Sequence, residues 1–213
     1  MLNIQRFVVN MIEENCYLLW DETGEAAIVD CGAYFEEDRE EIQKFVEEKK
    51  LTIVHHLLTH GHFDHIFGAQ FVSDTYGVLP QMAKTETENY SSQNEQLKMF
   101  LHRELPLSIP PFGKILDDGD TVTFGHQEFK VIYTPGHTPG GVCYYNEKEK
   151  ILLSGDSLFQ GSIGRTDFPG GSGQALIKSL SERILTLPEE VTVLPGHGPQ
   201  TTIGDEKRHN PYF

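Results

Sequence analysis

Thr59-His60-Gly61-His62-Phe63-Asp64-His65 is the stretch around which the fold and the chemistry of this chain are organised. It follows directly after a short apolar run, residues 53–58, whose aliphatic content and closing turn sequence predict a buried strand. Residues 64–76, closed by Gly77, carry apolar side chains at helical spacing and predict a helix. A turn between a strand and a helix is a common place for catalytic or binding side chains.

The spacing within this stretch favours two metal ions over one. His60 and His62 point to the same side of an extended chain, because side chains alternate there with a period of two. Asp64 and His65, at the start of the following helix, can then reach a second point nearby. Imidazole and carboxylate ligands suit zinc, and also iron or manganese, so the residue types leave the metal open.

The composition is that of one sizeable domain, 1–213, since 38% of the 213 residues are hydrophobic. The chain has 32 acidic against 17 basic side chains, a net charge of −15, which disfavours a nucleic-acid partner. The N-terminus lacks a signal-peptide pattern, and no apolar run has the length of a membrane helix. The three cysteines form no C-x-x-C pair. We therefore expect a soluble, cytoplasmic protein with buried thiols and no membrane partner.

Further elements are expected on both sides of the heptapeptide. Before it, the sequence predicts strands over residues 4–10, 16–20 and 26–30 and an amphipathic helix over residues 35–49. After it, we expect helices over residues 84–105 and 174–185, and strands near residues 121–124, 127–133, 142–146, 150–154 and 191–194. Strands followed by helices in both halves fit two sheets packed face to face with helices outside.

Three more residues of ligand type stand at the ends of predicted strands. They are His137 in Thr134-Pro135-Gly136-His137, Asp156 in Ser154-Gly155-Asp156, and His197 in Pro195-Gly196-His197. Each follows a glycine, which lets the backbone approach closely. Strand ends are also the rigid mounts that a set of ligands needs.

Together these residues resemble the metallo-β-lactamase fold superfamily, and the resemblance covers nearly the whole chain. It implies an α/β (α+β) fold, the four-layer αβ/βα sandwich, with the active site at one edge between the sheets. It also implies a first metal held by His60, His62 and His137, a second held by Asp64, His65 and His197, and Asp156 as a bridge. A bridging aspartate is similar to the pattern of the glyoxalase II-like hydrolases, the hydroxyacylglutathione hydrolases.

The resemblance implies a dinuclear metallohydrolase of a small acyl thioester, such as S-lactoylglutathione. Two divalent ions, expected to be zinc with iron or manganese as alternatives, would serve as cofactors. The expected reaction is attack of a metal-bound hydroxide on the thioester carbonyl, with Asp64 and Asp156 as catalytic residues. The partner is a small molecule, and the oligomeric state is left open.

The glycine-rich loop 159–171 leaves alternatives open. Arg165 is expected to bind a substrate carboxylate, although the loop can also be a simple connection. The segment 164–168, Gly-Arg-Thr-Asp-Phe, resembles the persulfide dioxygenases, mononuclear iron enzymes of the same fold. A lactonase or esterase and a non-catalytic metal-binding protein are further alternatives. We expect no C-terminal glutathione-binding helical domain, because the chain stops at Phe213, so dependence on glutathione stays open.

Overall fold

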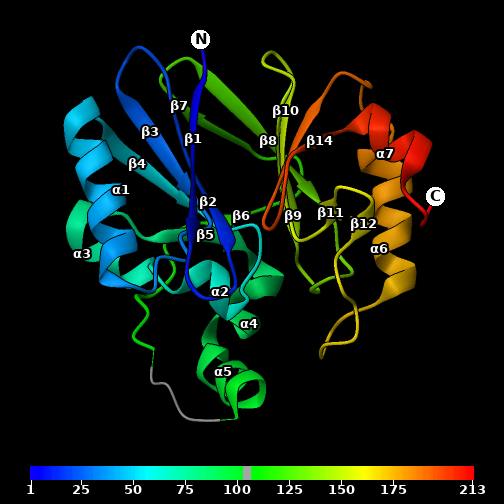
Figure 1. The fold of residues 1–213 in the computed structure, drawn as a ribbon, viewed down its shortest axis with the longest axis horizontal. Coiled ribbons are helices and arrows are strands. Elements are labelled where there is room, and N and C mark those ends of the chain that lie inside the picture. The colour runs from blue at the N-terminus through cyan, green and yellow to red at the C-terminus, as the bar shows by residue number, and fades with distance from the viewer. Residues whose placement is uncertain (103–106) are drawn as a thin grey trace.

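The computed structural model describes residues 1–102 and 107–213. Two six-stranded sheets pack face to face, and helices cover their outer faces (Figure 1). The expected four-layer αβ/βα sandwich is therefore confirmed. None of the helices in the described ranges combines the length and the apolar character needed to cross a bilayer.

The first sheet has the strand order β1-β2-β3-β4-β5-β6. In chain order its strands are β1 (Asn3–Val9), β2 (Glu14–Trp20), β3 (Glu25–Val29), β4 (Thr52–Leu57), β5 (Pro80–Ala83) and β6 (Ile115–Leu116). The pairs β1–β2 and β2–β3 are antiparallel, whereas β3–β4, β4–β5 and β5–β6 are parallel. The carboxyl ends of β3, β4 and β5 consequently meet at one edge of the sheet.

The second sheet has the order β14-β13-β10-β9-β8-β7. Its strands are β7 (Thr121–Phe124), β8 (Gln127–Tyr133), β9 (Val142–Asn146), β10 (Ile151–Gly155), β13 (Thr192–Pro195) and β14 (Thr201–Thr202), and a separate hairpin joins β11 (Leu158–Phe159) to β12 (Ser162–Ile163). Only β10 and β13 run parallel to each other within this sheet, as far as the described residues show.

The main core lies between the sheets, and β2 shows how its sequence produces it. Tyr17 and Leu19 belong to the cluster that packs against residues of the second sheet such as Phe129. Cys16 and Leu18, on the opposite face, belong to the cluster beneath the helices. Because both faces of β2 are covered, the strand reads as a continuous apolar run. Each fully buried leucine contributes roughly 1.5–3 kcal/mol.

The helices bury one stripe each against the sheets. On the first sheet, α1 (Glu36–Lys49) and α3 (Ala69–Tyr76) contribute Ile42, Val46 and Val72 to the hydrophobic cluster beneath the helices. On the other sheet, α6 (Gly173–Ser179), the π-helical turn η2 (Leu180–Ile184) and α7 (Ile203–His209) contribute Leu176, Leu180 and Ile203. This spacing of apolar residues is typical of amphipathic surface helices.

The single helix expected over residues 64–76 is wrong, because the structure has two helices, α2 (Phe63–Ile66) and α3. The break falls at Gly68, whose N–H donates to the Cys31 carbonyl at 2.8 Å. A Cβ at Gly68 would lie 2.6 Å from Cys31 Sγ, so only glycine allows this approach. The end of β3 therefore interrupts the helix.

The long helix expected over residues 84–105 is also divided. It consists of the 3₁₀ turn η1 (Lys84–Glu86), α4 (Thr87–Ser91) and α5 (Gln93–Leu101), with Ser92 outside the helical region at φ −96° and ψ 11°. The predicted end at Leu105 and Pro106 lies outside the described residues. The short elements β5, β6, β11, β12, β14 and α7 were not expected, because stretches of this length carry little periodicity.

Candidate metal centre

The seven residues singled out as metal ligands come from four chain segments that meet at one edge of the sandwich. His60, His62, Asp64 and His65 lie in the turn after β4 and in α2. His137 lies between β8 and β9, Asp156 directly follows β10, and His197 follows β13. The segments are distant in sequence, so the packing of the two sheets brings them together.

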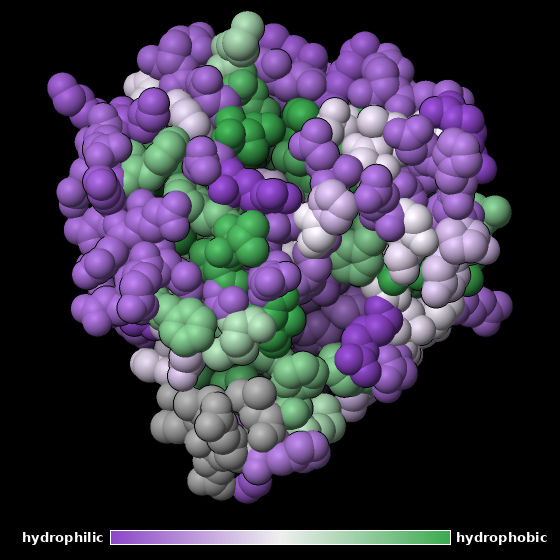
Figure 2. Space-filling model, in the orientation of Figure 1, coloured by the Kyte–Doolittle hydropathy of each residue, from purple (hydrophilic) through white to green (hydrophobic). Residues whose placement is uncertain are grey.

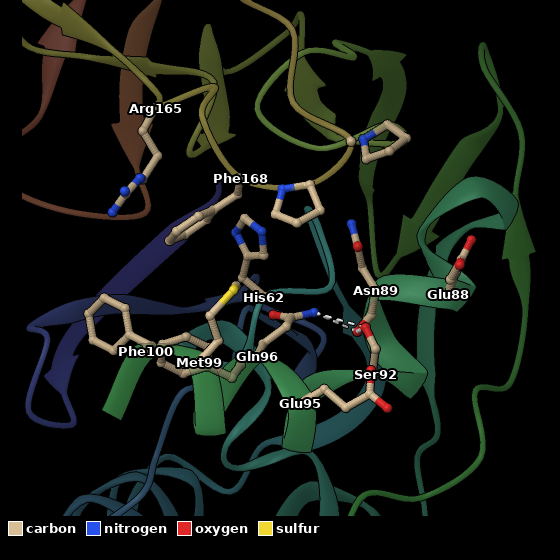
Figure 3. A pocket seen from close by; sticks show the side chains of 14 residues that line it. His62, Glu88, Asn89, Ser92, Glu95, Gln96, Met99, Phe100, Arg165 and Phe168 are labelled. Atoms are coloured by element: carbon tan, nitrogen blue, oxygen red, sulfur yellow. Dashed lines mark hydrogen bonds between the residues drawn. The ribbon is translucent and has the colours of Figure 1, made fainter. Parts of the chain in front are cut away.

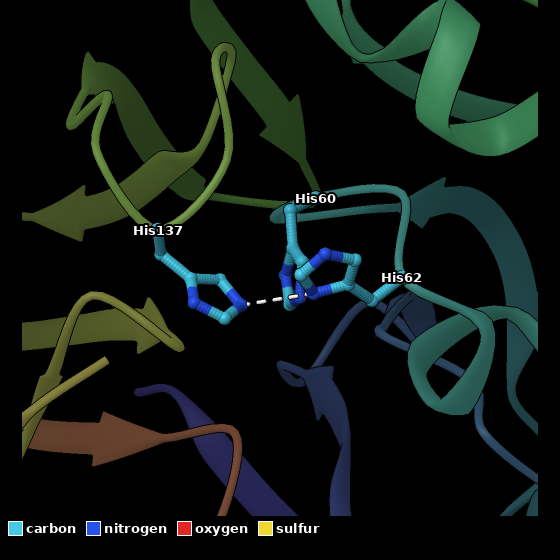
Figure 4. Close-up of side chains that lie close together, drawn as sticks. All are labelled: His60, His62 and His137. Carbon is cyan, nitrogen blue, oxygen red and sulfur yellow. Dashed lines mark hydrogen bonds between the residues drawn. The ribbon is translucent and has the colours of Figure 1, made fainter. Parts of the chain in front are cut away.

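His60, His62 and His137 form the first cluster, in which the nearest ring nitrogens all lie within 4.8 Å of one another. Nε2 of His137 is 2.9 Å from Nδ1 of His62 (Figure 4). All three side chains are buried. Nε2 of His60 has no hydrogen-bond partner among the described residues.

Asp64, His65 and His197 form the second cluster, again with ligand atoms within 4.8 Å of one another. Nε2 of His197 lies 3.2 Å, and Nε2 of His65 lies 3.8 Å, from Oδ2 of Asp64. His65 is fully buried, whereas the side chain of His197 is 24% exposed. The second cluster is therefore the more accessible one at His197.

Asp156 contacts both clusters. Its Oδ2 lies 3.6 Å from Nε2 of His137 in the first cluster and 3.8 Å from Nε2 of His197 in the second. Its Oδ1 lies 3.4 Å from Nε2 of His65. One carboxylate thus stands between two sets of ligand-type atoms, which is the placement that a bridging ligand needs.

Hydrogen bonds from outside the clusters orient the imidazoles. Nδ1 of His137 lies 2.7 Å from the Arg165 carbonyl oxygen, which can only accept, so this nitrogen carries the proton and Nε2 offers a lone pair. Nδ1 of His60 lies 3.0 Å from the hydroxyl of Thr59. That hydroxyl donates to Asp30 at 2.6 Å. Outer partners of this kind fix the tautomer of a ligating histidine.

Burial and charge set the protonation of the clusters. Burial and the neighbouring imidazoles hold the pKa of His60 well below its ordinary value, and burial with the nearby His137 lowers the pKa of His62 to about 3. Burial raises the pKa of Asp156, but the adjacent His65 more than offsets this and keeps that pKa well below its usual range. Neutral imidazoles and ionised carboxylates are the forms that ligate metals.

These residues fit divalent ions on structural grounds. Nε2 of His60, Nε2 of His65 and Oδ1 of Asp156 are buried and have no hydrogen-bond partner among the described residues. Buried polar atoms of this kind are costly unless they are satisfied, and a cation would satisfy all of them. The carboxylates also raise the pKa of His65 above its ordinary value, despite burial, so this location favours positive charge.

Comparison with known proteins agrees with this geometry. The family model of the metallo-beta-lactamase superfamily matches residues 12–197. The chain belongs to this superfamily. It is 36% identical to the hydroxyacylglutathione hydrolase GloC of Haemophilus influenzae, over 100% of this chain and 98% of that protein. The superfamily and this relative identify a metal-binding hydrolase.

Two solved structures are similar along their whole length. The BLEG-1 B3 metallo-beta-lactamase has a TM-score of 0.90 and 38% identity, with 100% of this chain and 99% of that chain covered. TTHA1623, solved in a di-iron-bound form, has a TM-score of 0.86 and 32% identity, with 98% and 100% covered. Relatives of this fold therefore include a protein that holds two iron ions.

A cavity of about 560 Å³ opens beside the first cluster, and His62 is one of its lining residues (Figure 3). Phe63, Phe100 and Phe168 contribute an apolar wall, while α4 and α5 supply polar side chains such as Asn89 and Glu95. Hydrophilic residues cover most of the face shown in Figure 2, and apolar residues are exposed along its middle and lower part. The lining of the cavity combines apolar and polar side chains.

Arg165 lines this cavity, but its guanidinium already has partners. Nε and Nη2 each donate to a carboxylate oxygen of Asp167 at 2.8 Å. The guanidinium carbon lies 3.8 Å from the centre of the Phe168 ring, which stands nearly perpendicular to the His62 ring at a centroid distance of 5.7 Å. The hydrogen bonds from Arg165 lower the pKa of Asp167 to about 2. A substrate carboxylate would have to compete with Asp167, and substrate binding by Arg165 stays a prediction.

The structure also shows supporting residues to which the sequence assigned no role. Asn15 donates from its side chain to the carbonyls of Pro195 and Gly198, both at 2.9 Å, on either side of His197. The Tyr17 hydroxyl donates to the same Pro195 carbonyl at 2.9 Å. β2 therefore holds the loop of His197. No periodicity or spacing in the sequence indicates this role, because the partners are about 180 residues apart.

Proposed function

We propose that the chain is a dinuclear metal-dependent hydrolase of a small acyl thioester, similar in activity to glyoxalase II. The observation that carries the proposal is the position of Asp156 between the two ligand clusters, beside a cavity that admits a small molecule. The similarity to a hydroxyacylglutathione hydrolase over the whole chain supports the thioester as substrate.

In this proposal His60, His62 and His137 hold one divalent ion, Asp64, His65 and His197 hold the other, and Asp156 contacts both. When bound, the two ions supply a nucleophile from water near neutral pH and polarise the carbonyl oxygen of the substrate. We propose zinc, with iron as the alternative because TTHA1623 binds two iron ions.

Side chains of the centre and of the cavity would orient the attacking water and limit the access of bulk solvent. Burial raises the pKa of Asp64, but His65 and the hydrogen bond from His197 outweigh this and lower it, so the carboxylate is ionised and, besides serving as a ligand, would orient the attacking water. The apolar wall of Phe63 and Phe168 beside His62 would limit the access of bulk water and contact the apolar part of the thioester.

Thiol release from S-lactoylglutathione by zinc-loaded protein, under strictly anaerobic conditions, tests the proposal. We expect rapid turnover that Asp156→Asn abolishes. Absence of turnover would overturn the thioester assignment. Iron-loaded protein with glutathione persulfide, followed by oxygen uptake, would then test the dioxygenase alternative. A β-lactam and a lactone complete the panel, because BLEG-1 is a B3 metallo-beta-lactamase.

A further inference from the structure

A buried glutamate outside the ligand set connects two of the ligand-bearing segments. Glu86, the last residue of η1, is fully buried, at 0% exposure. Its Oε2 accepts the backbone N–H of Gly61 at 2.8 Å and a side-chain N–H of Asn89 at 3.2 Å. Its Oε1 accepts the backbone N–H of Gly140 at 2.6 Å.

The two glycines belong to the segments of the first cluster. Gly61 stands between His60 and His62, and Gly140 lies in the β8–β9 connection that carries His137. His62 and His137 are 75 residues apart in the chain, yet their ring nitrogens approach to 2.9 Å. One carboxylate therefore binds the backbone on both sides of this approach.

The topology explains why Glu86 reaches both segments. β4 and β5 are parallel neighbours, so the segments that follow them emerge at the same edge of the sheet. The turn η1 after β5 and the helix α4 that follows it pack tightly there, since a Cβ at Gly61 would lie 2.7 Å from the backbone nitrogen of Tyr90 in α4. A Cβ at Gly140 would lie 2.1 Å from Oγ1 of Thr85. A side chain at Gly61 or at Gly140 would therefore not fit against these elements.

We propose that Glu86 is a positioning residue that sets the spacing of the three imidazoles in the first cluster. The inference rests on the proposed dinuclear site. Hydrogen bonds to an ionised acceptor are stronger than neutral ones, and here both oxygens are engaged by backbone donors from different segments. Glu86 is also the N-cap residue of α4, whose residues Glu88 and Asn89 line the cavity. The same carboxylate thus fixes the position of the cavity wall relative to the first cluster.

The substitution Glu86→Gln separates this role from simple structural support. The amide keeps the size of the side chain, but its NH₂ group would face one of the two backbone N–H groups and leave that donor unsatisfied. We expect the affinity of the first cluster for Co²⁺ to fall about 10–100-fold, as for other outer partners of ligands. The second cluster should keep its affinity, and the cobalt absorption bands should show which of the two sites has weakened.

Glu206→Gln is the matched control. Glu206 is also a buried glutamate, and it accepts the Gly161 N–H at 2.9 Å, the Thr201 hydroxyl at 2.6 Å and the Asn210 amide at 2.7 Å. None of these groups belongs to a segment of the first cluster. We expect this variant to lose thermal stability and to keep the cobalt affinity of the wild type.

Two results would overturn the proposal: wild-type affinity in Glu86→Gln, or equal losses of affinity in both variants. If Glu86→Gln does not fold, Glu86→Asp replaces it under the same criteria, because its shorter carboxylate keeps the charge but cannot reach both segments. Metal titration requires no substrate, so the outcome is independent of the thioester assignment. A wild-type protein that binds only one ion would refute the dinuclear function, while the effect of Glu86 on the first cluster would still be measured.

Discussion

Oδ2 of Asp30 lies 3.1 Å from Nδ1 of His65, and both side chains are buried. The same carboxylate accepts the backbone N–H of Thr59 at 2.7 Å and its hydroxyl at 2.6 Å. Thr59 in turn contacts His60. Asp30 therefore orients one imidazole of each cluster, His65 by a close charge contact that lacks hydrogen-bond geometry and His60 through the Thr59 hydroxyl. Its φ of 49° is a conformation that aspartate and asparagine tolerate better than most residues.

Asp30→Asn should weaken the second cluster, because the amide lacks the negative charge that the carboxylate places beside His65, while the backbone conformation is retained. We expect metal affinity there to fall about 10–100-fold. Competition with a chromophoric chelator measures this. Asp118→Asn is the control, since Asp118 accepts the Tyr133 N–H at 2.9 Å away from both clusters. Unchanged affinity in Asp30→Asn would contradict the orienting role.

Asp156→Ala should disrupt both clusters at once, because this carboxylate contacts histidines of each. His62→Ala should affect the first cluster most. We expect metal content and hydrolytic activity to fall together, with a loss of activity greater than the 100-fold typical of outer partners. Elemental analysis beside steady-state kinetics gives both quantities. A variant with full activity would refute the assignment of its residue.

Arg165→Ala should raise KM for an anionic thioester more than it lowers kcat, if the guanidinium contacts a substrate carboxylate. Asp167→Asn is the informative counterpart, because it removes the partner that now accepts both hydrogen bonds of Arg165. We expect a lower KM in this variant, measured under the same conditions. An unchanged KM in Arg165→Ala would mean that the side chain does not touch the substrate.

His56 should make the metal-free protein sensitive to acid. Both ring nitrogens of the buried His56 lack a partner among the described residues, whereas the half-buried His55 bonds to Thr123 and Gln81. Burial lowers the pKa of His56 to about 3.

Between pH 6.5 and about 3 the unfolded chain therefore binds a proton at His56 that the folded state does not, and the free energy of unfolding falls as the pH falls. The slope contributed by this group is about 1.4 kcal/mol per pH unit. His56→Leu should remove it. Urea unfolding at several pH values, with a chelator present throughout, compares the variant with the wild type. Identical slopes would contradict a neutral, buried His56.

Several features of the fold and the site were predictable from local sequence. The strand–turn–helix pattern around residues 59–65, and strands followed by helices in both halves of the chain, indicated the sandwich. The structure confirms this fold. The seven ligand-type residues were also visible, because each stands at the end of an apolar strand or in the heptapeptide, and the structure brings all of them to one edge. Their roles as ligands stay predictions.

Other features depend on contacts between segments that are distant in the chain. The helix break at Gly68 follows from the approach of Cys31, and the pairing of Arg165 with Asp167 depends on the conformation of a loop without periodicity. The hydrogen bonds of Glu86 to Gly61 and Gly140 join three segments, and nothing in the composition of residues 84–105 distinguishes this glutamate from its exposed neighbours.

The sequence by itself determined which residues of ligand type stand at strand ends and which elements support them, because residue type, spacing and turn signals act over a few positions. Only the tertiary structure decided which of these residues meet and what holds them there. Parallel pairing of β4 with β5, and packing of the second sheet against the first, bring Glu86 and His137 beside the heptapeptide. Such contacts arise from the burial of whole sheet faces, which no local pattern records.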